Sequence, residues 1–226
     1  LGTLLEDQPG ISNASFGPGV GRPVLRGMSG SRVKMMVNGH DSADLSAMSS
    51  DHAPMAEVSN ARQVEVIKGP ATLIYGNGAI GGVVNVIDNK IATEPVDKLS
   101  ANLGARVSSN DQGRELNAEV NAGNGQLAWH LDGFSKASSD YHSGHTSGEQ
   151  SGKSTKVKNS DTRTEGGSIG LSWTPLDKGY LGMSISQLEY DYGVPNEENT
   201  PTRVQPKQIR YDIKSAWLTP LPGITS

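Results

Sequence analysis

Two short clusters of imidazole and carboxylate side chains are the residues of this chain best suited to chemistry. Asp51 and His52 are adjacent, and His142 and His145 are separated by two residues. Imidazole nitrogens and carboxylate oxygens together bind zinc and similar divalent cations. The chain has no cysteine, which excludes disulfides and thiolate metal sites. We therefore expect Asp51, His52, His142 and His145 to ligate a metal ion, and we expect no resident cofactor.

A glycine-rich stretch raises a second kind of chemistry. Residues 76–81 match the pattern G-x-G-x-x-G of dinucleotide-binding proteins, but that site needs a helix directly after the glycines. Gly82–Ile87 follows instead, and its apolar, β-branched composition predicts a buried strand. Tight turns and close packing explain these glycines better. Because no nucleophile elbow or ordered Ser-His-Asp set stands out either, we predict that the protein is not an enzyme.

The composition limits the class of protein. Only 34% of the 226 residues are hydrophobic, which is low for a large compact core, and the 28 glycines favour turns and strands. The net charge of -4 leaves no basic surface, so we exclude nucleic acid as a partner. No apolar run approaches the roughly 20 residues of a membrane helix. Strands that cross a membrane alternate in polarity and never produce such a run.

The chain divides into two regions with different patterns. Residues 1–92 mix glycine, proline and short apolar runs, which predicts a small α+β domain. Residues 93–226 contain about six segments in which apolar and polar residues alternate strictly, so each is expected to form a strand with one apolar face. A soluble β-rich binding module remains an alternative, because many soluble antiparallel sheets alternate in the same way. The alternating segments are 99–107, 116–122, 127–132, 169–173, 181–186 and 209–214.

The connections between these strands favour a membrane barrel. Short links at residues 124–125, 175–179 and 220–223 are separated by long links at 140–163 and 191–205. Outer-membrane barrels have short periplasmic turns and longer outer loops. We therefore expect the apolar residues Leu99, Leu103, Ile209 and Ile213 to face lipid.

The aromatic residues map to two rims of such a barrel. Girdles of aromatic side chains at both interfaces are typical of a lipid-facing band. One predicted rim has Trp129, Trp173, Tyr180 and Trp217, and the opposite rim has Tyr141, Tyr190 and Tyr192. Six strands are fewer than the smallest outer-membrane barrel needs, and open edges are not viable in lipid. Either further strands lie beyond Ser226, or the sheet is not a membrane barrel.

Five motifs of the first region follow one another in an order typical of a known family. They are RPVLRG at 22–27, VKMMVNG at 33–39, VEVIKGP at 64–70, LIYG at 73–76 and GAIGGVVNVI at 78–87. Together they resemble the plug of TonB-dependent outer-membrane receptors. The remainder of the chain is similar to the family's early barrel.

The resemblance implies a fold and a function. The fold is an α+β plug domain, residues 1–92, followed by antiparallel transmembrane β-barrel strands in residues 93–226, the start of a barrel of about 22 strands that the plug fills. The function is TonB-dependent active transport of a scarce ligand across the outer membrane of a Gram-negative bacterium. The implied partners are the TonB energy-transducing complex of the inner membrane, outer-membrane lipid, and the transported metal or metal chelate. The segment that contacts TonB is expected before Leu1, so this chain is not expected to transport alone.

The ligand is the least constrained part of this interpretation. Asp51 and His52 lie between two predicted plug strands, where family members present an apical loop, and His142 and His145 lie in a long outer loop. These features, with DYGVP at 191–195, resemble the zinc-uptake branch of the family. A ferric siderophore or haem is the alternative ligand. Siderophore sites tend to use aromatic and arginine residues, which are scarce in this apical loop.

Charged residues of the plug are expected to pair with the polar inner wall of the barrel. Each exposed pair would contribute about 1 kcal/mol or less. The expected plug residues are Arg26, Arg32, Arg62, Glu65 and Lys68, and the expected wall residues are Arg106, Glu119, Asp132 and Arg210.

Overall fold

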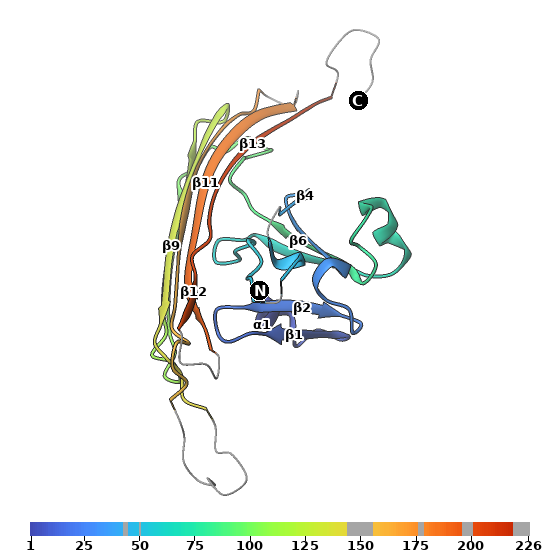
Figure 1. The fold of residues 1–226 in the computed structure, drawn as a ribbon. Helices are drawn as coiled ribbons and strands as arrows, with labels where there is room; N and C mark the ends of the chain where they lie inside the picture. The colour runs from blue at the N-terminus through green and yellow to red at the C-terminus, as the bar shows by residue number, and fades with distance from the viewer. Residues whose placement is uncertain (43–44, 50, 144–155, 176–178, 196–200, 219–226) are drawn as a thin grey trace, which may run out of the picture.

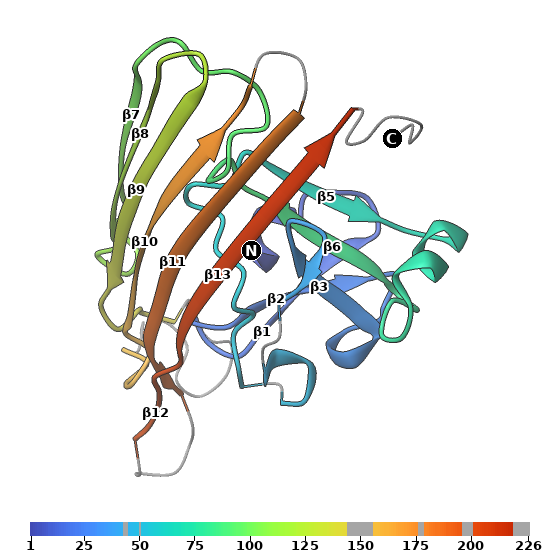
Figure 2. The ribbon, with the colours of Figure 1, turned by 90° about the horizontal axis from the view of Figure 1, so that it is seen from above.

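The protein consists of an N-terminal domain seated in the concavity of a curved β-sheet (Figure 1). The computed structural model describes residues 1–42, 45–49, 51–143, 156–175, 179–195 and 201–218. The long strands lie side by side and cover one flank of the N-terminal domain (Figure 2). Within the described residues, no helix has both the length and the apolar character to cross a membrane.

The N-terminal domain is built mainly from two small sheets. One pairs β1 (Ile11–Ser15) with β2 (Gly21–Leu25), and the other has the strand order β4-β3-β6-β5. Its strands are β3 (Val33–Val37), β4 (His40–Asp41), β5 (Gln63–Ile67) and β6 (Gly82–Ile87). The helical elements are short: α1 (Gly2–Leu5) and the 3-10 helices η1 (Gly30–Arg32), η2 (Leu45–Ala47) and η3 (Pro70–Tyr75).

Strand β6 forms the centre of this domain, as its sequence predicts. It pairs in parallel with β3 and antiparallel with β5, and Val83 and Val84 are fully buried. A strand covered on both faces favours a continuous β-branched run, which is what β6 contains. The core around Val84 includes Leu25, Val33 and Val86, all from this domain. The N-terminal domain therefore has an apolar core of its own.

The glycine-rich stretch before β6 is a turn, as expected, and no helix follows it. Gly76 and Gly78 have φ values of 72° and 86°, in the region that favours glycine. A Cβ atom at Gly81 would lie 2.7 Å from Cβ of Met28. The glycines therefore serve backbone geometry and close packing, and the dinucleotide interpretation is excluded.

The curved sheet is antiparallel throughout. Within the described residues it has seven strands in the order β12-β11-β10-β9-β8-β7, with β13 also paired to β11. The boundary predicted between residues 92 and 93 falls in the segment between β6 and β7, and the boundary itself stays a prediction. The strands are β7 (Ser100–Val107), β8 (Arg114–Gly123), β9 (Leu127–Ser138), β10 (Thr162–Trp173), β11 (Gly179–Val194), β12 (Thr202–Val204) and β13 (Lys207–Trp217).

The two faces of this sheet have opposite polarity. The outer face is apolar and exposed, and the inner face, turned toward the N-terminal domain, is polar. The four residues predicted to face outward, Leu99, Leu103, Ile209 and Ile213, are 73%, 79%, 49% and 76% exposed. The buried inner-face residues include His130, Asp132, Ser168, Ser172 and Ser184. Apolar surface outside and polar surface inside is the reverse of a water-soluble sheet with an apolar core.

One predicted rim of aromatic residues is confirmed in part, and the other is wrong for two of its three tyrosines. Trp173 and Trp217 meet edge to face, with ring centroids 5.8 Å apart, at the end of the sheet with the short turns. Tyr190 and Tyr192 lie at the opposite end, but they point inward. Tyr192 is 1% exposed and packs with Val20 and Ala53 of the N-terminal domain. These two tyrosines therefore do not form a lipid-facing girdle.

Candidate functional site

Asp51 and His52 form a polar pair on the N-terminal domain. His52 Nδ1 lies 3.0 Å from Asp51 Oδ1, and the hydroxyl of Ser49 also donates to that carboxylate. These two hydrogen bonds hold the pKa of Asp51 below its usual range, so the side chain stays ionised. Both side chains are about one-third exposed, at 35% for Asp51 and 27% for His52. An accessible carboxylate beside an imidazole offers two donor atoms to a cation.

The structure does not extend this pair to a larger metal site. His142 is exposed and forms a β-bridge with Lys156, and His145 lies outside the described residues. Among the residues that are described, no group of three or more His, Asp or Glu side chains is placed to hold a metal ion. Asp51 and His52 are thus brought together, and the proposed four-residue ligand set stays a prediction.

The backbone around Asp51 is hydrogen-bonded to the sheet mainly through the hydroxyl group of Tyr192. The phenol of Tyr192 donates to the carbonyl of Asp51 at 3.1 Å and accepts from the N–H of Ala53 at 3.0 Å. Tyr190 adds a weaker contact from its hydroxyl to the carbonyl of Pro54, at 3.3 Å. Since Tyr192 belongs to β11, the segment with the candidate metal ligands is positioned by the sheet.

Tyr192→Phe is expected to loosen this segment without opening a cavity. The change leaves the carbonyl of Asp51 and the buried N–H of Ala53 without their partner, which costs about 1–3 kcal/mol. Hydrogen exchange of the Ala53 amide should accelerate. Tyr211→Phe is the matched control, because Tyr211 is 74% exposed on the outer face. Equal exchange in both variants would contradict the positioning role.

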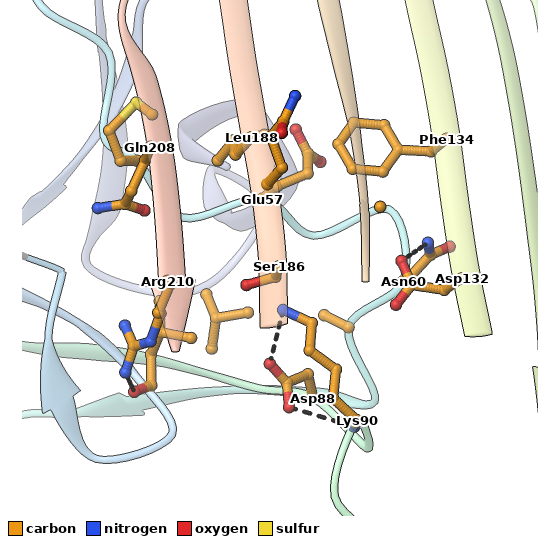
Figure 3. Close-up of a pocket in the computed structure, with 16 residues that line it drawn as sticks. Glu57, Asn60, Asp88, Lys90, Asp132, Phe134, Ser186, Leu188, Gln208 and Arg210 are labelled. Carbon is orange, nitrogen blue, oxygen red and sulfur yellow. Dashed lines mark hydrogen bonds and ion pairs between the residues drawn. The ribbon is translucent and has the colours of Figure 1, made fainter. Parts of the chain in front are cut away.

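A buried polar network around Asp132 of β9 also joins the N-terminal domain to the curved sheet. Asn60 of the N-terminal domain donates from Nδ2 to Asp132 Oδ1 at 2.8 Å (Figure 3). The same carboxylate accepts from His130 Nε2 at 2.8 Å and from the hydroxyl of Ser168. As whole residues, His130 and Asp132 are 4% and 8% exposed. Because these groups are almost fully buried, each depends on its hydrogen-bond partners.

An ion pair forms a second attachment. Lys136 Nζ of β9 lies 2.6 Å from Glu57 Oε1, and Ser59 donates to Glu115 of β8 at 2.8 Å. Burial raises the pKa of Glu57, but the Lys136 ammonium and the N–H groups of Val58 and Ser59 outweigh it. The pKa of Glu57 therefore lies below its usual value, and the pair is ionised at neutral pH.

The segment after β6 packs directly against the sheet, where two neighbouring strands each have a glycine. A Cβ atom at Gly170 of β10 would lie 1.8 Å from the carbonyl oxygen of Lys90. A Cβ atom at Gly182 of β11 would lie 2.4 Å from Cγ2 of Ile91. Gly170 and Gly182 lie on the inner face, so each glycine leaves the space that the segment occupies.

A small cavity lies between the N-terminal domain and the curved sheet, in the region between these attachments. Its volume is about 70 Å³, enough for a few water molecules. Asp88, Lys90, Ser186 and Arg210 are among the residues that line it (Figure 3). Lys90 Nζ lies 3.1 Å from Asp88 Oδ2, and Arg210 donates to the carbonyl of Val37 at 3.2 Å. Apolar residues such as Val37, Met55 and Leu188 line the same cavity, so the interface here combines ion pairs and hydrogen bonds with apolar contacts.

The predicted charge pairs between the N-terminal domain and the sheet are wrong for the residues of the N-terminal domain. Glu119, Asp132 and Arg210 of the sheet do contact the N-terminal region, through Asn89, Asn60 and the carbonyl of Val37. Among the described residues, none of Arg26, Arg32, Arg62, Glu65 and Lys68 forms an ion pair with the sheet. Glu65 and Lys68 bond within their own domain, to Asn85 and to the carbonyl of Pro9.

The sequence reasoning singled out neither His130 nor Glu57. A signal existed for His130, because it alternates with Trp129 and Leu131 and must lie on the same face as Asp132. Glu57 sits in an irregular segment with no periodicity. Its side chain accepts hydrogen bonds from the N–H groups of Val58 and Ser59, a local geometry that the pattern did not reveal.

Comparison with known proteins defines the class of this fold. Residues 1–83 match the family model of the TonB-dependent Receptor Plug Domain. Residues 1–83 of the N-terminal domain therefore form a plug domain, and the antiparallel strands that follow share their fold with part of two solved transporters. Below, the N-terminal domain is called the plug and the curved sheet is called the wall.

Individual relatives extend the similarity over most of the chain. The vitamin B12 transporter BtuB of Photobacterium profundum is 27% identical over 211 residues, which cover 88% of this chain and 32% of that protein. The copper transporter OprC superposes with a TM-score of 0.70 at 22% identity, covering 92% of this chain and 31% of that one. The FrpB iron transporter from Neisseria meningitidis (F3-3 variant) has a TM-score of 0.73 at 16% identity, covering 100% of this chain and 36% of that one. The chain thus spans about a third of the length of these three proteins.

Proposed function

We propose that this chain is the plug and the first wall strands of a TonB-dependent transporter in the outer membrane of a Gram-negative bacterium. The observation that supports this most strongly is the polarity of the wall. Its outer face exposes Leu103, Trp129 and Ile213, and its inner face buries His130 and Asp132 beneath the plug. A wide barrel leaks unless it is filled, so a polar plug against a polar lumen fits an energised gate. The proposed partners are the TonB complex and outer-membrane lipid.

The alternative is a soluble β-rich binding module. Soluble monomers rarely expose contiguous apolar patches larger than a few hundred Å². The outer face of this wall carries large exposed apolar side chains on every long strand. That arrangement favours lipid as the environment of the outer face.

Fractionation and uptake test the proposal. The full-length protein should sediment with the outer membrane, require detergent for extraction, and accumulate its ligand only in cells with an intact TonB complex. Recovery in the soluble fraction, or uptake that persists without TonB, would refute the proposal.

A pair of neighbouring substitutions tests the lipid-facing assignment. Leu103→Arg places a cation on the outer face of β7 and is expected to destabilise the inserted protein by about 2–4 kcal/mol. Asn102→Arg places the same cation on the opposite face, where lumen positions tolerate charge. The outer-membrane level of each variant is the measurement. Equal losses for both variants would show that the faces are misassigned.

We further propose that the transported ligand is a metal ion, with zinc favoured, or a metal complex. Asp51, His52, His142 and His145 are the proposed ligands. Support comes from the contact between Asp51 and His52, and from the ionised state of Asp51. Two of the three similar transporters are named for metals, copper and iron. A ferric siderophore or haem is the alternative ligand.

Zinc titration of the full-length protein tests the ligand assignment. Asp51→Ala combined with His52→Ala should weaken zinc binding at least tenfold, which corresponds to a loss of about 1.4 kcal/mol. His40→Ala is the matched control, because His40 is an exposed histidine of the same domain. Unchanged zinc affinity in the double variant would exclude Asp51 and His52 as ligands and would leave the transport proposal intact.

A further inference from the structure

The imidazole of His130 is bonded through both of its nitrogens. Nδ1 lies 2.8 Å from Asn121 Oδ1 on β8, and Nε2 lies 2.8 Å from Asp132 Oδ2 on its own strand. The side chains of His130 and Asp132 are each 4% exposed. A neutral imidazole carries one N–H donor and one bare acceptor nitrogen, whereas an imidazolium carries two donors. The partners of the two nitrogens therefore reveal how many protons the ring carries.

The partner of Nδ1 is an acceptor. Asn121 Nδ2 lies 2.6 Å from Glu119 Oε1 and donates to it. Turning the amide over would place two oxygens 2.6 Å apart and lose that bond. The carboxylate of Glu119 therefore fixes the orientation of Asn121, which presents its carbonyl oxygen to His130. Nδ1 must carry a proton to make this contact a hydrogen bond.

The partner of Nε2 is also an acceptor. Asp132 Oδ2 accepts from the hydroxyl of Ser168, and Oδ1 accepts from Asn60 Nδ2 at 2.8 Å. A carboxylate that already accepts from two donors is stabilised in its ionised form. Nε2 must therefore carry a proton as well.

We propose that His130 is a proton-binding site between plug and wall, occupied by a second proton so that the ring is an imidazolium. The surrounding charges support this assignment. Asp132 and Glu119 are carboxylates, Ser168 and Gly170 of β10 carry no charge, and the plug contributes the amides of Asn60 and Asn89. The nearby cation Lys90 is paired with Asp88. A cation beside the carboxylate of Asp132, with Glu119 directly opposite Asp132 on β8, is favoured electrostatically.

The bound proton strengthens the attachment of the plug. If His130 loses it, one of the two 2.8 Å contacts becomes a pair of facing acceptors. The ring then either releases Asp132, which holds Asn60 of the plug, or releases Asn121, whose other end holds Glu119. Glu119 in turn accepts from Asn89 at 2.6 Å. Loss of the proton therefore weakens the contact of Asn60 or of Asn89 with the wall.

Nitrogen NMR of histidine in the purified protein in detergent tests the charge directly. At a pH of about 7, His130 should give two protonated ring-nitrogen signals, assigned by their loss in His130→Gln. His142→Gln is the control, because His142 is exposed. A bare nitrogen in the His130 ring would overturn the proposal. A carboxylic acid band in the infrared spectrum that disappears in Glu119→Gln would place the proton on Glu119 and also overturn it.

Hydrogen exchange tests the consequence for the plug. The amides of residues 57–62 should exchange about tenfold faster in His130→Gln than in the wild-type protein, because a charge-assisted hydrogen bond is lost. His142→Gln should leave them unchanged. Unaltered protection of residues 57–62 in His130→Gln would separate His130 from plug attachment and overturn its role there.

Discussion

Gly170→Ala will displace the segment that leads from the plug to the wall. The added Cβ atom would lie 1.8 Å from the carbonyl oxygen of Lys90 and 2.8 Å from its carbonyl carbon. Both are backbone atoms, so no side-chain rotation relieves the overlap. His130 Cβ, at 3.3 Å, is a further close contact of the added atom. We expect a loss of about 3 kcal/mol in the stability of the seated plug, at the upper end for overpacked interiors.

The measurement is thermal unfolding of the purified protein together with protease sensitivity of residues 88–96. Gly133→Ala on the neighbouring strand is the matched control, because its nearest added contact is an ordinary 3.8 Å. If Gly170→Ala and Gly133→Ala unfold at the same temperature with the same protease pattern, the position of the segment does not depend on the absence of a side chain at residue 170.

Lys136→Met will destabilise the plug–wall interface by about 2–4 kcal/mol, because removing one member of a largely buried ion pair leaves the other uncompensated. Glu57 is 15% exposed and retains only neutral donors once the ammonium is gone. The loss should appear as a lower free energy of unfolding at neutral pH. Glu165→Gln is the control, since it breaks an ion pair with Arg163 that is open to solvent, and it should have no measurable effect.

The pH dependence of Lys136→Met follows from the same pair. The pKa of Glu57 is depressed in the folded protein, so its contribution to stability is complete above the pKa of an unfolded glutamate, about 4.3. The contribution is lost as the pH falls through the depressed value. The stability difference between wild type and Lys136→Met should therefore be constant near neutrality and shrink in acid. A double-mutant cycle with Glu57→Gln isolates the coupling between the two side chains.

The strands of the wall could be predicted because their signal is local. Alternation along a single strand identifies both the strand and its two faces, and Leu103 and Ile213 lie on the face that their sequence neighbours indicate. The same rule would have corrected the error at Tyr190 and Tyr192. Both have the parity of Gly182 and Ser184 on β11, which face inward. Their position near a rim suggested a girdle, and the parity of the strand overrides that position.

The contacts between plug and wall could not be predicted, because they join segments without periodicity to a surface far away in sequence. Asn60 meets Asp132 across 72 positions, and Glu57 meets Lys136 across 79. Nothing in the chain near Asn60 indicates which strand lies opposite. Charge alone predicts partners such as Arg26 and Lys68, whereas the interface uses amides and backbone carbonyls as often as ions.

Near the end of β11, the plug and the wall make apolar contacts, in which Val20 and Ala53 pack on Tyr192 and Val194. Elsewhere charged and amide groups contribute to the interface. Dissolved ions act on these two kinds of contact in opposite directions. Sulfate promotes the burial of hydrocarbon, while any added electrolyte screens an ammonium from a carboxylate. Rising sulfate concentration should therefore strengthen the apolar contacts near Tyr192 and weaken the ion pair of Lys136. The ionic composition of the solution should thus determine which part of the plug detaches from the wall first.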